Sequence, residues 1–141
     1  MHIAEQLASV LPIMQEVVIP YHHPNPPEQS EIEVAYLMAQ HFNAHVEFLI
    51  PVDDYKRKTP DISIAGVLWE IKRPVGSSKT TISNQFKRAA KQSKYIIFDA
   101  RALRMTDLHI ERKVRQQFEL RKSLKRVILV SKASEIVDMK R

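Results

Sequence analysis

The chain contains no cysteine, so a disulfide framework and a thiolate zinc site are both excluded. It also lacks an apolar run long enough to span a bilayer, and residues 1–5 do not have the basic and then apolar layout of a signal peptide. No internal repeat is visible. Folding without redox chemistry fits a cytoplasmic protein, and equally one that unfolds and refolds while it crosses a membrane.

Acidic residues are fewer than basic ones, with 16 Asp and Glu against 22 Lys and Arg and a formal net charge of +6. A basic balance favours a polyanionic partner, most simply nucleic acid. The 141 residues are 44% hydrophobic, which is enough for one domain with its own core and leaves no room for a second.

The segment from Pro60 to Lys72 predicts a tight antiparallel β-hairpin. Two apolar runs rich in β-branched and aromatic residues are separated only by Ala65-Gly66. The facing pairs are then Ile64 with Val67, Ser63 with Leu68, and Ile62 with Trp69. In this register Asp61 faces Glu70, and both project on the same side as Lys72 because side chains alternate across a strand.

These three charged side chains suggest a metal site. Two carboxylates that face each other across a sheet repel unless a cation lies between them. Oxygen ligands suit a hard divalent ion, Mg²⁺ first and Mn²⁺ second. The Lys72 ammonium, one strand step away, could orient or deprotonate a water and neutralise charge on a phosphate. The alternative is an ordinary solvent-exposed polar face of a hairpin.

A third acid lies upstream, on a helix predicted from Glu31 to about Asn43, with Ser30 as its cap and Glu33 at the capping-box position. The apolar stripe of this helix consists of Val34, Ala35, Met38, Ala39 and Phe42. Glu31 falls near the middle of that stripe, where a carboxylate is costly unless it is paired or bound to a metal. The alternative is that Glu31 reaches solvent from the first turn and interacts with the helix dipole.

The rest of the pattern predicts an α/β fold. Helices are expected at residues 3–15, 81–94 and 108–120, strands at 17–19, 45–50, 95–98 and 126–130, and a terminal turn or helix at 133–140. Alternating helices and strands indicate crossover connections and a single-domain, three-layer sandwich around a central mixed sheet. We expect this domain to span residues 30–141, preceded at residues 1–29 by a helix and a proline-rich linker.

Basic and amide side chains follow the hairpin. Arg73 and Lys79 belong to a flexible, basic segment that is predicted to contact phosphates. Gln85, Arg88 and Gln92 form a polar ridge on the next helix, suited to hydrogen-bonding a phosphate or a ligand of the metal. The alternative is that this ridge is only the solvated flank of the helix.

A helix Glu, a strand Asp after proline and a Glu-Ile-Lys strand resemble the PD-(D/E)xK nuclease superfamily. The wider run of motifs resembles the C-terminal toxin domain of contact-dependent growth inhibition proteins of the CdiA type, whose members are tRNA nucleases. This run comprises Glu31 with Ala35, Thr59 to Ile62, Trp69 to Lys72, and Thr81-Ile82 through Ala90 to Ser93 and on to Asp99. The similarity covers residues 30–101, about half of the chain.

The resemblance implies a PD-(D/E)xK-like fold and a metal-dependent endoribonuclease that cuts tRNA, as a toxin domain or a free-standing relative of one. Carried over by position, the metal-binding acids are Glu31, Asp61 and Glu70, the catalytic lysine is Lys72, and Gln85 and Gln92 lie beside the site. It also implies secretion, action in the target-cell cytoplasm and an acidic immunity protein. A DNA endonuclease with the same site and a non-catalytic nucleic-acid-binding module remain open.

Overall fold

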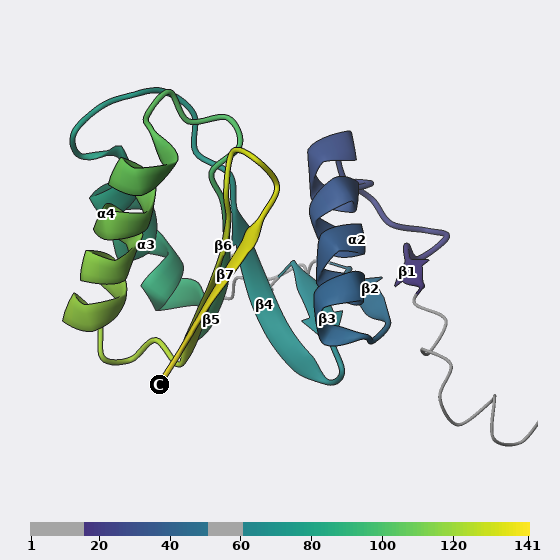
Figure 1. Ribbon diagram of the computed structural model, residues 1–141. Helices are drawn as coiled ribbons and strands as arrows, with labels where there is room; N and C mark the ends of the chain where they lie inside the picture. The colour runs from purple at the N-terminus through teal and green to yellow at the C-terminus, as the bar shows by residue number, and fades with distance from the viewer. Residues whose placement is uncertain (1–15, 51–60) are drawn as a thin grey trace, which may run out of the picture.

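The computed structural model describes residues 16–50 and 61–141, which form a seven-stranded mixed sheet with helices on both faces (Figure 1). The strands are β1 (Val17–Val18), β2 (Val46–Phe48), β3 (Ile62–Ile64), β4 (Val67–Lys72), β5 (Tyr95–Asp99), β6 (Arg126–Val130) and β7 (Ile136–Lys140), and the helices are α2 (Gln29–Phe42), α3 (Thr81–Gln92) and α4 (Asp107–Leu120). The strands lie in chain order across the sheet. The predicted helix at 3–15 lies outside the described residues.

Two separate cores hold this sheet between its helices, which confirms the predicted three-layer α/β sandwich. Figure 1 shows α2 on one face and α3 and α4 on the other. On β5, Ile97 packs in the α2 core whereas Ile96 and Phe98 pack in the core under α3 and α4. Because adjacent side chains point to opposite faces, a strand buried on both sides reads as a continuous apolar run. This explains why β5 and β6 were recognisable as central strands.

The β3–β4 hairpin forms in the predicted register. Ile62 pairs with Trp69, Ser63 with Leu68, and Ile64 with Val67. Ala65 and Gly66 have φ values of 49° and 84°, so both turn residues adopt the positive φ of a type I′ turn. This turn matches the right-handed twist of the flanking strands, which favours a two-residue connection.

The C-terminal segment differs from its prediction. Residues 133–140 were expected to form a turn or a helix, but β7 runs antiparallel to β6 over the whole of that strand. Ser134, with a φ of 63°, makes the turn, and the Ser131 N–H donates to the Glu135 carbonyl. Pairing with β7 satisfies the outer backbone groups of β6, and this tertiary requirement overrides the local pattern.

The described part of the segment before residue 30 is attached to the sheet. β1 pairs in parallel with β2, and the His23 Nε2 atom lies 2.8 Å from the Leu49 carbonyl. None of the described helices is long and apolar enough to cross a membrane. The division between residues 1–29 and 30–141 stays a prediction.

Candidate functional site

The ends of three elements meet at one end of the sheet. Arg101, just after β5, hydrogen-bonds the Ser30 carbonyl and the Glu33 side chain near the start of α2, and Arg73, just after β4, contacts Asp99 at the end of β5. β4 and β5 are parallel neighbours, so their carboxyl ends share this edge. In open α/β sheets, ligands bind outside the carboxyl ends of the strands. Lys72, a predicted site residue, is the last residue of β4.

Glu70 and Lys72 form a pair on the side of β4 that faces away from α2. Trp69 and Ile71 pack in the α2 core, and the alternation along β4 directs Glu70 and Lys72 to the opposite face. Glu70 is only 7% exposed, and the Lys72 Nζ atom lies 3.3 Å from Glu70 Oε1. A carboxylate is held in such a buried position only with a charged or hydrogen-bonding partner. The predicted common side of these two residues is therefore confirmed.

Asp61 lies one residue before β3 and does not continue the strand as expected. Its N–H donates to the Trp69 carbonyl at 3.0 Å, and its Oδ2 atom accepts the Ile71 N–H at 2.7 Å. Asp61 thus contacts both chain neighbours of Glu70. The side-chain bond satisfies the Ile71 N–H at the level where the ladder between β3 and β4 has ended.

The pKa of Asp61 is raised above its ordinary value of 3.8. Burial is the largest cause and raises it; the hydrogen bond from Ile71 lowers it, the charge of Glu31 raises it and the charge of Lys72 lowers it. Desolvation disfavours the charged form of a carboxylate unless cations compensate. The hydrogen bond from Ile71 and the charge of Lys72 therefore do not offset the cost of burying the ionised Asp61 carboxylate.

Glu31 occupies the third position of α2 and completes a capping box with Glu28. Its Oε1 atom accepts the Glu28 N–H at 3.0 Å, while the Glu28 side chain accepts the N–H of Glu31. The predicted cap by Ser30 with Glu33 is wrong, because the helix begins at Gln29, two residues earlier than expected. Glu31 is half-buried, and its charge acts on Asp61.

The oxygen donors fit a hard divalent cation, although they do not form a ready-made cage. Within residues 16–50 and 61–141, no three His, Asp or Glu side chains are grouped closely enough to hold a metal ion. Carboxylate oxygens are the type of ligand that a hard divalent cation prefers. Mg²⁺ usually keeps several waters and is bound by one or two carboxylates with substrate phosphates. Metal binding by Asp61 and Glu70, with Glu31 as a third acid, stays a prediction.

A second charged cluster was missed from the sequence. Asp99 is fully buried; Arg101 donates to both of its carboxylate oxygens, from Nε at 2.9 Å and from Nη2 at 3.0 Å. Arg73, a predicted phosphate ligand, lies with its Nε atom 3.5 Å from Asp99 Oδ2. The available signal was an Asp at the end of a continuously apolar strand with an Arg two residues later.

The other predicted nucleic-acid contacts lie on or just before α3. Lys79 and Arg88 are exposed, whereas Gln85 and Gln92 are half-buried. Among the residues that the structure describes, Gln92 Oε1 is a buried side-chain oxygen without a hydrogen-bond partner. Binding of nucleic acid by these four residues stays a prediction.

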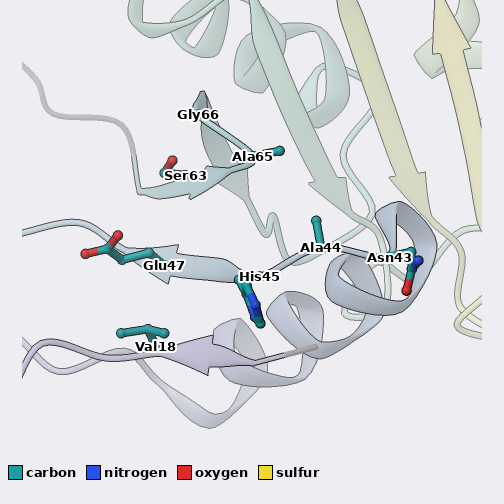
Figure 2. Close-up of a pocket in the computed structure, with 8 residues that line it drawn as sticks. All are labelled: Val18, Asn43, Ala44, His45, Glu47, Ser63, Ala65 and Gly66. Carbon is teal, nitrogen blue, oxygen red and sulfur yellow. The ribbon is translucent and has the colours of Figure 1, made fainter. Parts of the chain in front are cut away.

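A separate hollow of about 370 Å³ lies by the turn end of the β3–β4 hairpin (Figure 2). Glu47 and Ser63, which face each other on β2 and β3, contribute its polar groups together with His45 and Asn43. It is lined by none of the predicted site residues. Asp61 stands at the opposite end of the hairpin from the Ala65-Gly66 turn, so the two places are distinct.

The family model described as contact-dependent growth inhibition CdiA C-terminal domain matches residues 58–136, which is more than half of the chain. The chain belongs to this family. This CdiA C-terminal domain has Asp61, Glu70 and Lys72 inside the matched region and Glu31 outside it. Membership supports a role as a toxin in contact-dependent growth inhibition.

The fold of the CdiA C-terminal domain is also found among solved structures. A chain of a CdiA-CT/CdiI toxin and immunity complex from Burkholderia pseudomallei is similar, with a TM-score of 0.63. The likeness covers 89% of this chain and 99% of that chain at 16% sequence identity, so it shows the fold alone. No curated protein matches the sequence.

Proposed function

We propose that this CdiA C-terminal domain is a metal-dependent endoribonuclease toxin whose substrate is tRNA. The proposal is carried by the buried Glu70–Lys72 pair beside Asp61, a carboxylate whose pKa burial raises. Buried carboxylates with shifted pKa values next to a lysine are typical of sites for acid–base and metal chemistry. The net charge of +6 is consistent with a polyanionic substrate.

In this mechanism Asp61 and Glu70 would hold a divalent ion, Mg²⁺ or Mn²⁺, with Glu31 as the third acid. The ion would supply Lewis-acid polarisation of the phosphate and a lower pKa for the attacking water. The hydrogen bond from Ile71 orients the Asp61 carboxylate. Lys72, held 3.3 Å from Glu70, either accepts the proton of the attacking water or stabilises negative charge on the phosphate.

The substrate backbone is proposed to contact the segment after β4 and the helix α3. The contacts are assigned to Arg73, Lys79, Gln85, Arg88 and Gln92. Phosphate contacts of this kind position a nucleic acid and carry no information on its sequence. They also do not distinguish RNA from DNA, which requires a contact to the 2′-hydroxyl.

The deciding experiment is digestion of total tRNA by the purified chain with Mg²⁺ and with EDTA. Asp61→Ala and Lys72→Ala are expected to lower the cleavage rate at least about 100-fold, the scale of a lost catalytic group. Glu119→Ala and Lys122→Ala are matched controls, because this 3.6 Å ion pair has side chains 74% and 73% exposed. Cleavage that is indifferent to EDTA and to both site variants would end the proposal.

Parallel assays separate the alternatives. Preferential digestion of plasmid DNA would indicate a DNA endonuclease with the same site. RNA binding that weakens with salt, without cleavage or Mg²⁺ uptake, would indicate a non-catalytic binding module.

We also propose an immunity partner of acidic character. The structural neighbour is a toxin in complex with an immunity protein, and the basic charge of this chain suits an acidic surface. The toxin would be secreted and act in the cytoplasm of the target cell, while the partner protects the producing cell. A pull-down from producing cells that captures no acidic protein would count against this partner.

A further inference from the structure

Helix α3 lies in a segment of the chain that has positive charges and no negative ones. Between Glu70 on β4 and Asp99 at the end of β5, the sequence contains no Asp or Glu. The basic residues on α3 and directly after it are Lys87, Arg88, Lys91 and Lys94. Opposite charges three or four residues apart stabilise a helix, and α3 has no pair of this kind.

These cations have no acidic partner elsewhere in the described protein either. All four are exposed, and over residues 16–50 and 61–141 none of them forms an ion pair with an acidic side chain. Lys87 and Lys91 lie four residues apart, and like charges at that spacing destabilise a helix. The outer face of α3 therefore lowers the stability of the helix, a cost that a bound polyanion removes.

The segment after α4 brings a further lysine to the end of this face. The Lys125 N–H donates to the Lys94 carbonyl at 2.8 Å, and both residues are exposed. Ile96 and Val127, two residues further along each strand, pack in the core under α3 and α4. Because side chains alternate along a strand, both lysines project to the side of the sheet that α3 and α4 cover. We call Lys87, Lys91, Lys94 and Lys125 the lysine track.

The lysine track leads from the proposed site along the length of the sheet. β4 and β5 are parallel neighbours joined through α3, so α3 runs from the carboxyl end of β4 to the amino end of β5. Lys72 is the last residue of β4, whereas Lys94 directly precedes β5. With 12 residues and a rise of about 1.5 Å per residue, α3 is about 18 Å long. The far end of the track is therefore remote from Lys72.

The neighbouring helix α4 has a different surface, which helps to identify the ligand of the track. On α4, Arg115 pairs with Glu111 at 3.6 Å, and Leu108 and Leu120 are exposed. Protein interfaces are enriched in apolar, aromatic and Arg side chains and depleted in Lys. Among the described residues, none of the large exposed apolar side chains lies on α3. Lysine is a compact point charge that suits phosphate, so the track favours a nucleic-acid backbone over an acidic protein.

We propose that the lysine track binds the phosphate backbone of RNA, so that the substrate extends from the proposed site along α3 to the amino ends of β5 and β6. The inference rests on the proposed function because it takes RNA as the substrate, but it does not depend on metal binding. Each phosphate contact releases counterions, so the affinity of such a surface falls steeply with salt. A contact remote from the reacting phosphate holds substrate and transition state equally, so its loss raises KM and leaves kcat unchanged.

The test is binding of total tRNA to the full chain in EDTA, measured by fluorescence anisotropy at several salt concentrations. A track variant with Lys91→Gln, Lys94→Gln and Lys125→Gln should bind about 10- to 100-fold more weakly at about 0.1 M salt. The slope of log affinity against log salt should become shallower by about two to three, close to one for each lysine removed. Its unfolding temperature should not fall, because exposed like charges are removed.

A control variant of equal net charge separates the position of the lysines from their number. Arg112→Gln, Arg115→Gln and Lys122→Gln remove three exposed cations from α4 and the segment after it. This variant should bind tRNA within about threefold of the wild type, because at 0.1 M salt charges more than about 10 Å away are screened.

The outcomes distinguish this inference from the proposed function. Equal weakening in both variants would show an effect of net charge alone. Unchanged tRNA binding in the track variant, with reduced capture of an acidic protein, would assign the track to a protein partner. Either result overturns the inference alone. A wild type that binds no tRNA at low salt overturns both the inference and RNA as the substrate, whereas binding through the track without cleavage in Mg²⁺ supports the inference and overturns the nuclease function.

Discussion

Two partly buried carboxylates near opposite ends of the sheet, Asp138 and Asp61, are compensated to different extents. At the end with the β3–β4 turn, Asp138 is hydrogen-bonded by Arg126 and His41. Burial alone would raise the pKa of Asp138. The hydrogen bonds from Arg126 and His41 and the charges of both residues lower it by more, so the pKa lies below 3.8. At the other end, burial of Asp61 is opposed only by a backbone N–H and the charge of Lys72, and its pKa lies above 3.8.

The surroundings of the two carboxylates differ in the same sense. Beside Asp138, the rings of Phe42, Trp69 and Tyr95 form a chain of contacts at 5.7 and 5.3 Å, and the Arg126 guanidinium lies 4.8 Å from the centre of Phe42. This end has the charge balance and aromatic packing of a structural support. At the other end, Asp99 and Glu70 have cationic partners, whereas the charge of Asp61 is compensated incompletely, which is the expected condition of a ligand site.

The largest expected effect is at the aromatic end. Trp69→Ala removes a side chain that is 2% exposed and in contact with both neighbouring rings, so the free energy of unfolding should fall by about 3–5 kcal/mol. Urea denaturation measures this loss. Leu68→Ala, the adjacent residue at 47% exposure, is the control and should cost far less. Equal losses would contradict the burial of Trp69 in the α2 core and the exposure of Leu68 on the other side of β4.

A smaller effect should distinguish the two carboxylates directly. Asp138→Asn weakens the charged contacts to Arg126 and His41, so we expect the free energy of unfolding to fall by about 1–2 kcal/mol at pH 7. Asp61→Asn keeps an acceptor for the Ile71 N–H and removes a poorly compensated charge. It should leave stability unchanged or raise it slightly, while cleavage of RNA is lost. Destabilisation of both variants to the same extent would remove the distinction between the two ends.

The smallest expected effect is on how the difference in free energy of unfolding between the wild type and each Asn variant changes with pH. The folded pKa of Asp61 is raised, so its ionised form destabilises the fold, and protonation relieves this as the pH falls through that pKa towards 3.8. The folded pKa of Asp138 is lowered, so its contribution is present above 3.8 and is lost as the pH falls through the lower value. Urea denaturation between pH 7 and about pH 3 gives the free energy of unfolding of the wild type relative to Asp61→Asn and relative to Asp138→Asn. As the pH falls, the first of these differences should move in favour of the wild type and the second against it. The same direction for both would contradict the assignment.

Local sequence patterns were sufficient to predict the hairpin, the central strands and the apolar faces of the helices. The alternation of apolar residues on both sides of Ala65-Gly66 requires one register, because a shift by one residue would turn Ile62 and Trp69 away from the core. The pairing of Glu70 with Lys72 follows from the same alternation. Metal binding and RNA cleavage by these residues stay predictions, which the assays above address.

Contacts between distant segments were decided only by the tertiary structure. Residues 133–140 became a strand because β6 offered unpaired backbone groups. The capping role of Glu31 depended on a helix start displaced by two residues, and the contact of Arg101 with Glu33 joins residues 68 positions apart. Periodicity along the chain specifies which face of an element is buried. It contains no information on which charged ends of different elements meet, because that depends on how the elements pack.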